Sequence, residues 1–483
     1  MTLNKKNYDM PVDEFRKYGH QLIDWISDYL ESIENYPVLS KVKPNSIEKK
    51  LPKDPPKEHE SMDDIFNDLN KIIMPGITHW NHPGFMAYFN STSSGPGILG
   101  ELLSGAFNIN GMIWKTSPAS TELETVTLNW LRKMLQLPEK FWGIIYDLAS
   151  ISSLHAIAAA REQAKETYSD FKLEKLRIYI SEQAHSSIEK AVKTLGLKPS
   201  SIVKIKVDNN FSMIPELLDK AIKKDIEKGF QPFCIVATFG TTSTASIDPI
   251  SEISKISLKR QLWLHIDAAY AGSAAIIPEI RTYLNGVENA DSLVLNPHKW
   301  MFIPIDLSVL FISKPKLLKK AFSLVPEYLK TSEDKDVINY MDYGIQLGRR
   351  FRSLKLWFVI RYFGANGLQK IINEHIRIAK KFAGYIDLDN NFVRLAPTHF
   401  STVCFRAVPN AKLNNSELDK FNEKLMREIN NTGVIFLSHT KLNGIFTIRL
   451  VISGIRTTEQ HMENAWNLIK NTTNLLIKNY SKN

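Results

Sequence analysis

The stretch Ser292-Leu-Val-Leu-Asn-Pro-His-Lys299 begins with the apolar residues of a buried strand and ends in polar ones. Leu262-Trp-Leu-His-Ile-Asp267, which precedes it, follows the same pattern and ends in an acid. Helical segments, for example residues 152–165 and 215–228, separate several such runs. Apolar strands that alternate with crossover helices predict an α/β fold with a mostly parallel central sheet and helices on both faces. The other runs expected to be strands are residues 143–146, 177–180, 202–207, 233–239 and 307–312.

The regions on either side of this alternating part have different patterns. Residues 13–33 carry apolar and aromatic side chains at helical spacing, and this helix covers either the core of its own chain or a partner subunit. A proline-rich linker and a second short helix after Ser61 follow. Late in the chain the pattern changes to helices with a few strands, such as 401–406 and 445–451. We therefore expect an N-terminal helical segment (1–94), a large α/β domain (95–368) and a small C-terminal α+β domain (369–483).

The composition is that of a soluble globular protein. The start of the chain lacks the apolar core of a secretory signal, and no run of about 18 apolar residues could span a membrane. Two cysteines, Cys234 and Cys404, form neither a disulfide framework nor a metal-ligand cluster, so we expect a cytoplasmic protein without a metal site. The net charge of +10 could attract nucleic acid. However, lysines are mixed with acids in stretches such as 220–228, which favours a solvated surface and no nucleic-acid partner.

Asp267 and Lys299 each follow an apolar strand, and ligands of open α/β sheets bind at the carboxyl ends of the strands. Two interpretations fit this pair. It could form a structural salt bridge, or it could bind pyridoxal phosphate, which needs a lysine for a Schiff base and an acid facing the pyridine nitrogen. The spacing alone does not separate the two.

The surrounding residues favour the cofactor. Small residues after Asp267, among them Ala269, would let a flat ring lie against the backbone. His185 follows another predicted strand and is either structural or stacked on the ring. Ala149 and Ser150 precede a helix, where backbone N–H groups either cap the helix or bind a phosphate.

Several long motifs, in one order, resemble the group II pyridoxal-phosphate decarboxylases, specifically the aromatic L-amino-acid decarboxylase branch. The resemblance extends over nearly the whole length of the chain. The motifs are His82-Pro-Gly-Phe-Met-Ala-Tyr-Phe89, Ser117-Pro-Ala-Ser-Thr-Glu-Leu-Glu124, Ser181-Glu-Gln-Ala-His-Ser-Ser187, Gly240-Thr-Thr242, His265-Ile-Asp-Ala-Ala-Tyr-Ala-Gly272, Asn296-Pro-His-Lys-Trp300 and Leu347-Gly-Arg-Arg-Phe-Arg-Ser-Leu-Lys355.

The resemblance implies a fold similar to the fold type I pyridoxal-phosphate transferases and a homodimer with sites at the interface, which the N-terminal segment would embrace. It implies that Lys299 carries the cofactor, that Asp267 faces the pyridine nitrogen and that His185 lies on the ring face, near the substrate. Further residues implied at the site are Ala149, Ser150, Asn296 and His298 for the phosphate, Thr242 and Ala269 for the ring, and Trp80, Tyr88, Phe89 and Ser91 for the substrate.

The resemblance also implies that Tyr340 is catalytic and returns a proton to the substrate. It lies in residues 332–346, which are either a lid over the site or an ordinary surface loop. Relatives with phenylalanine at this position resemble aldehyde synthases, so the tyrosine favours simple decarboxylation. Tyr343 and Gly344 stand where the family usually has Trp-Gln, so Tyr343 is a second candidate for the proton donor.

The function expected from all of this is decarboxylation of an aromatic L-amino acid (tryptophan, tyrosine, DOPA or phenylalanine) to its amine and carbon dioxide. Three alternatives remain open. One is an aldehyde synthase, and another is a decarboxylase of histidine or of an acidic amino acid. The aromatic residues near the substrate and the absence of an obvious arginine there argue against an acidic substrate. The third is a non-catalytic protein that binds pyridoxal phosphate or nucleic acid.

Overall fold

The structure is a computed structural model that describes residues 9–324, 332–333, 335–409 and 413–480. Its centre is a seven-stranded sheet in the order β1-β7-β6-β5-β4-β2-β3. β7 is antiparallel to both of its neighbours, whereas the pairs from β6 to β3 are parallel, so the predicted mostly parallel sheet is confirmed. All seven predicted strands are found: β1 Trp142–Tyr146, β2 Leu176–Ser181, β3 Ile202–Ile205, β4 Gln231–Thr238, β5 Trp263–Asp267, β6 Ser292–Leu295 and β7 Ser308–Ile312.

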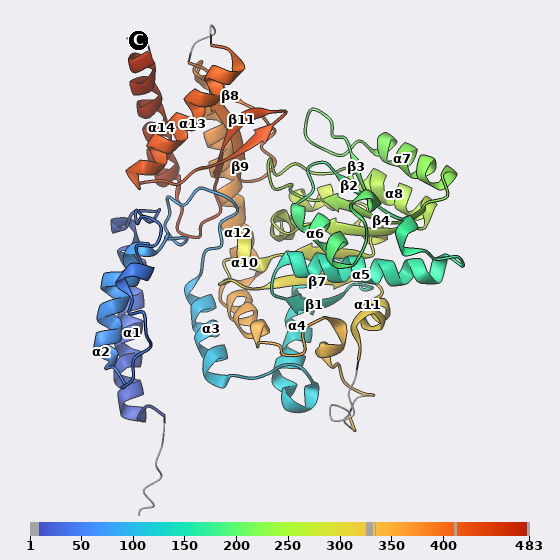
Figure 1. The fold of residues 1–483 in the computed structure, drawn as a ribbon, viewed down its shortest axis with the longest axis horizontal. Coiled ribbons are helices and arrows are strands. Elements are labelled where there is room, and N and C mark those ends of the chain that lie inside the picture. Colours follow the sequence, from blue (N-terminus) through green and yellow to red (C-terminus); the bar gives the residue numbers. More distant parts are fainter. Residues whose placement is uncertain (1–8, 325–331, 334, 410–412, 481–483) are drawn as a thin grey trace, which may run out of the picture.

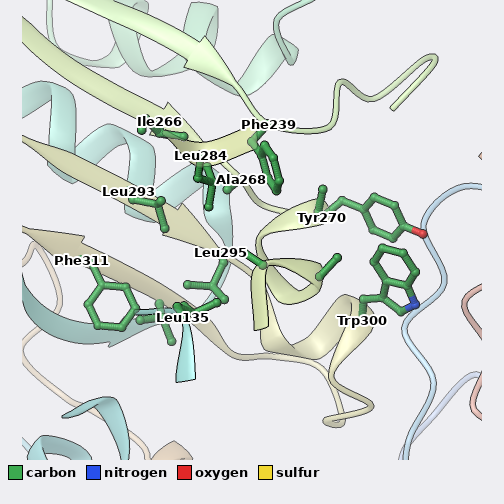
Figure 2. Packing of buried hydrophobic residues seen from close by; sticks show 14 of the residues in the cluster. Leu135, Phe239, Ile266, Ala268, Tyr270, Leu284, Leu293, Leu295, Trp300 and Phe311 are labelled. Atoms are coloured by element: carbon green, nitrogen blue, oxygen red, sulfur yellow. The ribbon is translucent and has the colours of Figure 1, made fainter. Parts of the chain in front are cut away.

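The strands are apolar throughout because both faces of the sheet are buried. Successive residues of a strand point to opposite faces, so Leu264 and Ile266 enter one core while Trp263 enters the other. Figure 2 shows part of the first core, where Ile266, Leu293 and other side chains of the sheet pack together. The helices that cover the sheet include α4 Pro118–Met134, α5 Ala149–Thr167, α6 Ser186–Thr194, α7 Pro215–Glu227, α8 Ile250–Arg260 and α11 Pro315–Phe322.

The N-terminal helices pack on each other beside the main body of the molecule (Figure 1). α1 (Val12–Glu31) contacts α2 (Met62–Asp68) through the Tyr18 and Phe66 rings, whose centroids are 6.1 Å apart. The predicted helix start at Ser61 is confirmed, because the Ser61 hydroxyl accepts the Asp64 N–H at 3.1 Å. α3 (Gly95–Phe107) then leads into the large domain.

The C-terminal part has its own antiparallel sheet in the order β10-β11-β9-β8 and its own core. It begins within α12 (Arg352–Leu388), a long helix that is kinked at Gly364 and crosses the boundary expected at residues 368/369. The strands expected at 401–406 and 445–451 correspond to β9 and β11. No helix among the described residues has both the length and the apolar character needed to cross a bilayer. The remaining elements are β8 Phe392–Arg394, β9 Thr402–Ala407, α13 Asn415–Thr432, β10 Ser438–Leu442, β11 Ile445–Val451 and α14 Glu459–Tyr480.

Candidate active site

The strand ends of β5 and β6 form one wall of a cavity of about 210 Å³. Asp267 is the last residue of β5, and Lys299 follows β6 on a short helical turn, α10 (Pro297–Trp300). The structure brings together all nine residues predicted to bind the cofactor. The lining residues are Phe89, Leu148, Ala149, Ser150, His185, Ser187, Thr238, Gly240, Thr242, Asp267, Ala269, Tyr270, Asn296, His298 and Lys299.

Lys299 lies beside an aromatic side chain. Its Nζ is 5.3 Å from the centroid of the Phe89 ring. Burial lowers the pKa of Lys299, and the negative charge of Asp267 opposes the shift only in part. A lowered pKa increases the fraction of neutral amine, which is the nucleophilic form of lysine.

Asp267 is buried and held by the turn that follows it, where the Ala269 N–H donates to Asp267 Oδ1 at 3.1 Å. Thr238 pairs with Asp267 across β4 and β5 and lines the same cavity. The Thr238 hydroxyl is buried and has no hydrogen-bond partner among the described residues. Sequence reasoning missed Thr238, although the polar residue near the end of an apolar run is the same signal that identified Asp267.

His185 is the residue before α6 and caps this helix with its own side chain. Its Nδ1 accepts the Ser187 N–H at 3.2 Å and lies 2.8 Å from Ser187 Oγ. Burial lowers the pKa of His185, and the positive charges of Lys299 and Lys190 add to this effect, while Asp267 opposes it. The imidazole is therefore neutral near neutral pH.

The other end of the cavity is suited to an anion. α5 begins at Ala149, and the N–H groups of Ile151 and Ser152 donate to Leu148 O, which leaves the first N–H groups of the helix facing the cavity. The dipole of this helix favours a negative charge at that position. Ala149 and Ser150 therefore lie where a phosphate group would bind.

His298 and Asn296 lie at the same cavity. The His298 ring is fixed with Nδ1 2.6 Å from Leu307 O, and burial lowers the pKa of His298 to about 4. Asn296 Oδ1 is buried and has no partner among the described residues. Buried polar atoms almost always have partners, so the free Asn296 and Thr238 oxygens indicate that a polar ligand completes this cavity. The lysine, the acid and the anion-binding helix end fit pyridoxal phosphate.

The loop after β4 forms another wall of the cavity. Gly240 has a φ of +91°, and a Cβ there would lie 2.6 Å from Ala271 Cβ, so this turn requires glycine. Thr242 lines the cavity from this loop, and its carbonyl accepts an N–H from Arg449 of β11 at 2.9 Å. The same guanidinium donates to Ser243 O at 2.8 Å. Sequence reasoning missed Arg449, because nothing in its own strand indicates a contact with the loop after β4.

The residues predicted to contact the substrate are divided between two places. Phe89 lines the cavity and stacks on Tyr270, with ring centroids 3.7 Å apart, and Tyr270 stacks on Trp300 in turn (Figure 2). Trp80 and Tyr88 stack on each other outside the cavity, and their exposed fractions are 40% and 51%. Ser91 does not line the cavity either.

The structure does not bring Tyr340 to Lys299. The Tyr340 hydroxyl lies 3.1 Å from Thr125 Oγ1, and its buried ring lies between Trp142 and the Arg349 guanidinium. Tyr343 also packs on Trp142, and its carbonyl accepts a hydrogen bond from the Tyr146 hydroxyl. The described part of residues 332–346 therefore packs against β1 and α4 of its own chain.

A buried lysine, an acid at the end of the neighbouring strand and a helix start for a phosphate define a pyridoxal-phosphate enzyme with a fold of the type I class. The model of the pyridoxal-dependent decarboxylase conserved domain matches residues 44–408. The chain belongs to this family of decarboxylases, and its cofactor is pyridoxal phosphate.

Relatives with known activities match the chain over almost its whole length. It is 42% identical to tyrosine decarboxylase 4 of Petroselinum crispum, covering 96% of this chain and 94% of that one. It is 42% identical to tryptophan decarboxylase 2 of Oryza sativa subsp. japonica, covering 95% of each chain. It is 41% identical to phenylacetaldehyde synthase of Arabidopsis thaliana, covering 97% of each chain. The crystal structure of Oryza sativa TDC with pyridoxal phosphate and tryptamine superposes with a TM-score of 0.95, at 35% identity, covering 98% of this chain and 100% of that one.

Proposed function

We propose that this protein decarboxylates an aromatic L-amino acid to the corresponding amine and carbon dioxide. The observation that carries the proposal is the wall beside Lys299, which consists of the Phe89 ring supported by Tyr270. Arg449 lies near this wall, but its N–H groups are bonded to Thr242 O, Ser243 O and Ser438 Oγ, and it does not line the cavity. An aromatic wall without an arginine favours an aromatic side chain over an acidic one.

The residues that line the cavity have different roles in the proposal. When bound, pyridoxal phosphate supplies an electron-accepting ring that stabilises the negative charge left on the substrate Cα when carbon dioxide departs. Lys299 would provide the amine for covalent attachment, and Asp267 would keep the pyridine nitrogen protonated. His185 would cover one face of the ring. Ala149, Ser150, Asn296 and His298 would surround the phosphate, and Thr242 and Ala269 would contact the ring from the strand ends.

Product analysis tests the proposed function. The purified protein, saturated with pyridoxal phosphate, is incubated separately with tryptophan, tyrosine, DOPA, phenylalanine, histidine and glutamate. We expect carbon dioxide and the matching amine from at least one aromatic substrate and no product from glutamate. Exclusive turnover of histidine or glutamate would contradict the proposal, and so would the absence of any amine.

Aldehyde synthesis is the second candidate function, because a phenylacetaldehyde synthase is as similar to this chain as the decarboxylases are. An aldehyde synthase consumes dioxygen and water and releases carbon dioxide, ammonia and hydrogen peroxide together with the aldehyde. Measuring amine, aldehyde and peroxide in one incubation separates the two functions. We expect amine in large excess over aldehyde, with no peroxide above the enzyme-free control.

We further propose that the chain forms a homodimer. The α3 helix exposes apolar side chains, among them Leu102 at 51% and Phe107 at 55%, and Tyr362 of α12 is 73% exposed. A hollow of about 500 Å³ lined by Trp357, Phe358 and neighbouring residues adjoins them. An apolar surface of this kind is typical of an interface between subunits. Light scattering tests the proposal: we expect the mass of two chains, and we expect Leu102→Glu to shift the protein to a single chain.

We also propose a cytoplasmic location. Both cysteines are buried and free, which fits a reducing compartment. Fractionation of cells that express the tagged full chain tests this, with recovery in a membrane or secreted fraction as the contradicting result.

A further inference from the structure

His185 faces the cavity with only one of its two ring nitrogens free. The other, Nδ1, contacts two groups of Ser187: the backbone N–H at 3.2 Å and the hydroxyl oxygen at 2.8 Å. The hydroxyl can donate or accept, so it fits either form of the ring. The backbone N–H can only donate, so it decides which ring nitrogen of His185 carries the proton.

A nitrogen that accepts an N–H uses its lone pair and carries no proton. If Nδ1 of His185 were protonated, its hydrogen would point at the hydrogen of the Ser187 backbone amide. The neutral ring must therefore carry its proton on Nε2. No acceptor for Nε2 lies within hydrogen-bond distance among the residues that the structure describes, and both His185 and Ser187 line the cavity.

Burial keeps the ring neutral. It is the main cause that disfavours a positive charge on His185; Asp267 favours the charge, and Lys299 and Lys190 oppose it. The balance lowers the pKa of His185, so the neutral form with Nε2–H persists at neutral pH.

We infer that Ser187 is a positioning residue that fixes His185 as the Nε2–H tautomer, so that His185 offers the cavity a permanent hydrogen-bond donor and no base. The inference rests on the proposed site. It has a chemical consequence: Nε2 cannot accept a proton from the substrate. Nδ1 can accept one only after its bond to the Ser187 N–H is broken. The neutral ring is also a very weak acid, because loss of the Nε2 proton would leave an imidazolate anion. The proton that replaces the carboxylate therefore comes from another group.

Nitrogen-15 NMR of the histidine-labelled holoenzyme, without substrate, reads the tautomer directly, because a protonated and an unprotonated ring nitrogen differ widely in chemical shift. The chain has 12 histidines, and the difference spectrum of His185→Gln identifies the signals of His185. We expect an unprotonated Nδ1 and a protonated Nε2 at neutral pH. A protonated Nδ1 in the unchanged protein would overturn the inference without any further variant.

Two substitutions at Ser187 separate the backbone from the hydroxyl. Ser187→Ala keeps the N–H and should keep the Nε2–H tautomer. Ser187→Pro removes both donors and should give a mixture of tautomers; proline is tolerated in the first turn of a helix, where Ser187 stands. Two results would contradict the inference that the Ser187 backbone N–H fixes the tautomer. One is a pure Nε2–H signal in Ser187→Pro, and the other is loss of the Nε2–H signal in Ser187→Ala. Product analysis plays no part in these measurements, so a failure here is distinct from a failure of the proposed function.

Discussion

Lys299 Nζ lies 5.3 Å from the centroid of the Phe89 ring, and Phe89 is itself held parallel to Tyr270 at 3.7 Å. Lys299 comes from the end of β6, whereas Phe89 precedes the whole α/β domain in the sequence. The fold therefore places the reactive amine against an apolar ring that does not belong to its own sheet. The amine is buried at this position, and burial lowers the pKa of Lys299.

Lys299→Ala should abolish amine production and the absorbance band of the covalently attached cofactor. The reason is that no other lysine lines the cavity among the described residues. The check is absorbance after saturation with pyridoxal phosphate, followed by borohydride reduction and peptide mass spectrometry. We expect the cofactor on Lys299 of the unchanged protein and no labelled peptide in the variant. A label on a different lysine of the unchanged protein would refute the site.

Arg449→Gln should weaken cofactor binding although Arg449 does not line the cavity. Its guanidinium donates to Thr242 O and Ser243 O and so fixes the loop that lines the site. We expect the Kd for pyridoxal phosphate to rise about tenfold, equivalent to about 1.4 kcal/mol. The measurement is a cofactor titration of the apoprotein followed by absorbance.

Arg406→Gln is the matched control for this prediction. Arg406 is a buried arginine of the same small sheet, and its hydrogen bonds to Asn415 and Asp419 remain within the C-terminal part. It should lower the stability of the protein and leave the Kd for the cofactor unchanged. Equal effects of the two substitutions on the Kd would show that Arg449 acts only through stability.

The protein should lose stability as the pH falls from about 6.5 to 4. Burial lowers the pKa of His265 and of His375 to about 4 in the folded chain, from an unfolded value of 6.5. Because the folded pKa is depressed, the unfolded state binds protons first, and folding loses about 2 kcal/mol per histidine at pH 5. Urea unfolding at pH 7.5 and 5, with cofactor in excess, measures the loss.

His375→Gln tests the origin of this pH dependence. His375 Nδ1 accepts the Trp300 indole N–H at 3.0 Å, and the glutamine amide oxygen can accept it instead. The variant should show a smaller difference in stability between pH 7.5 and 5 than the unchanged protein. An identical difference in both proteins would mean that other groups cause the acid sensitivity.

The sheet and the main polar residues of the site were predictable because they depend on local pattern. A strand buried on both faces must be apolar along its whole length, so each polar residue at its end, such as Asp267, is conspicuous. β10 (Ser438–Leu442) was missed because its residues, Ser-His-Thr-Lys-Leu, are mostly polar and alternate in burial. The prediction that the small residues after Asp267 make room for a flat ring fits only some of them. Ala269 lines the cavity, whereas a Cβ on Gly272 would lie 2.8 Å from Leu295 Cβ, so Gly272 serves close packing.

The parts of the site that were not predictable depend on contacts between distant segments. Arg449 reaches the Thr242 loop from the four-stranded sheet, and no spacing within its strand reveals this. Trp80 and Phe89 lie close together in the sequence, yet only Phe89 lines the cavity in the described chain. The largest difference between the sequence-based prediction and the structure concerns Tyr340. Its sequence position suggests a catalytic role, whereas its hydroxyl is hydrogen-bonded to Thr125.

Tyr340→Phe should leave amine as the main product and lower the free energy of unfolding by about 1 kcal/mol, the typical value of one buried hydrogen bond. The reason is that the Tyr340 hydroxyl contacts Thr125 and lies outside the Lys299 cavity. The measurement is the ratio of amine to aldehyde, together with urea unfolding. Tyr343→Phe and Tyr328→Phe are the parallel variants, because Tyr343 and Tyr328 are the other two tyrosines between Lys299 and Leu347 in the sequence. Tyr328 lies outside the described residues. A switch from amine to aldehyde in Tyr340→Phe would show that its segment moves to a catalytic site and that the hydroxyl protonates the substrate. A switch in one of the other two variants would assign the proton to that tyrosine.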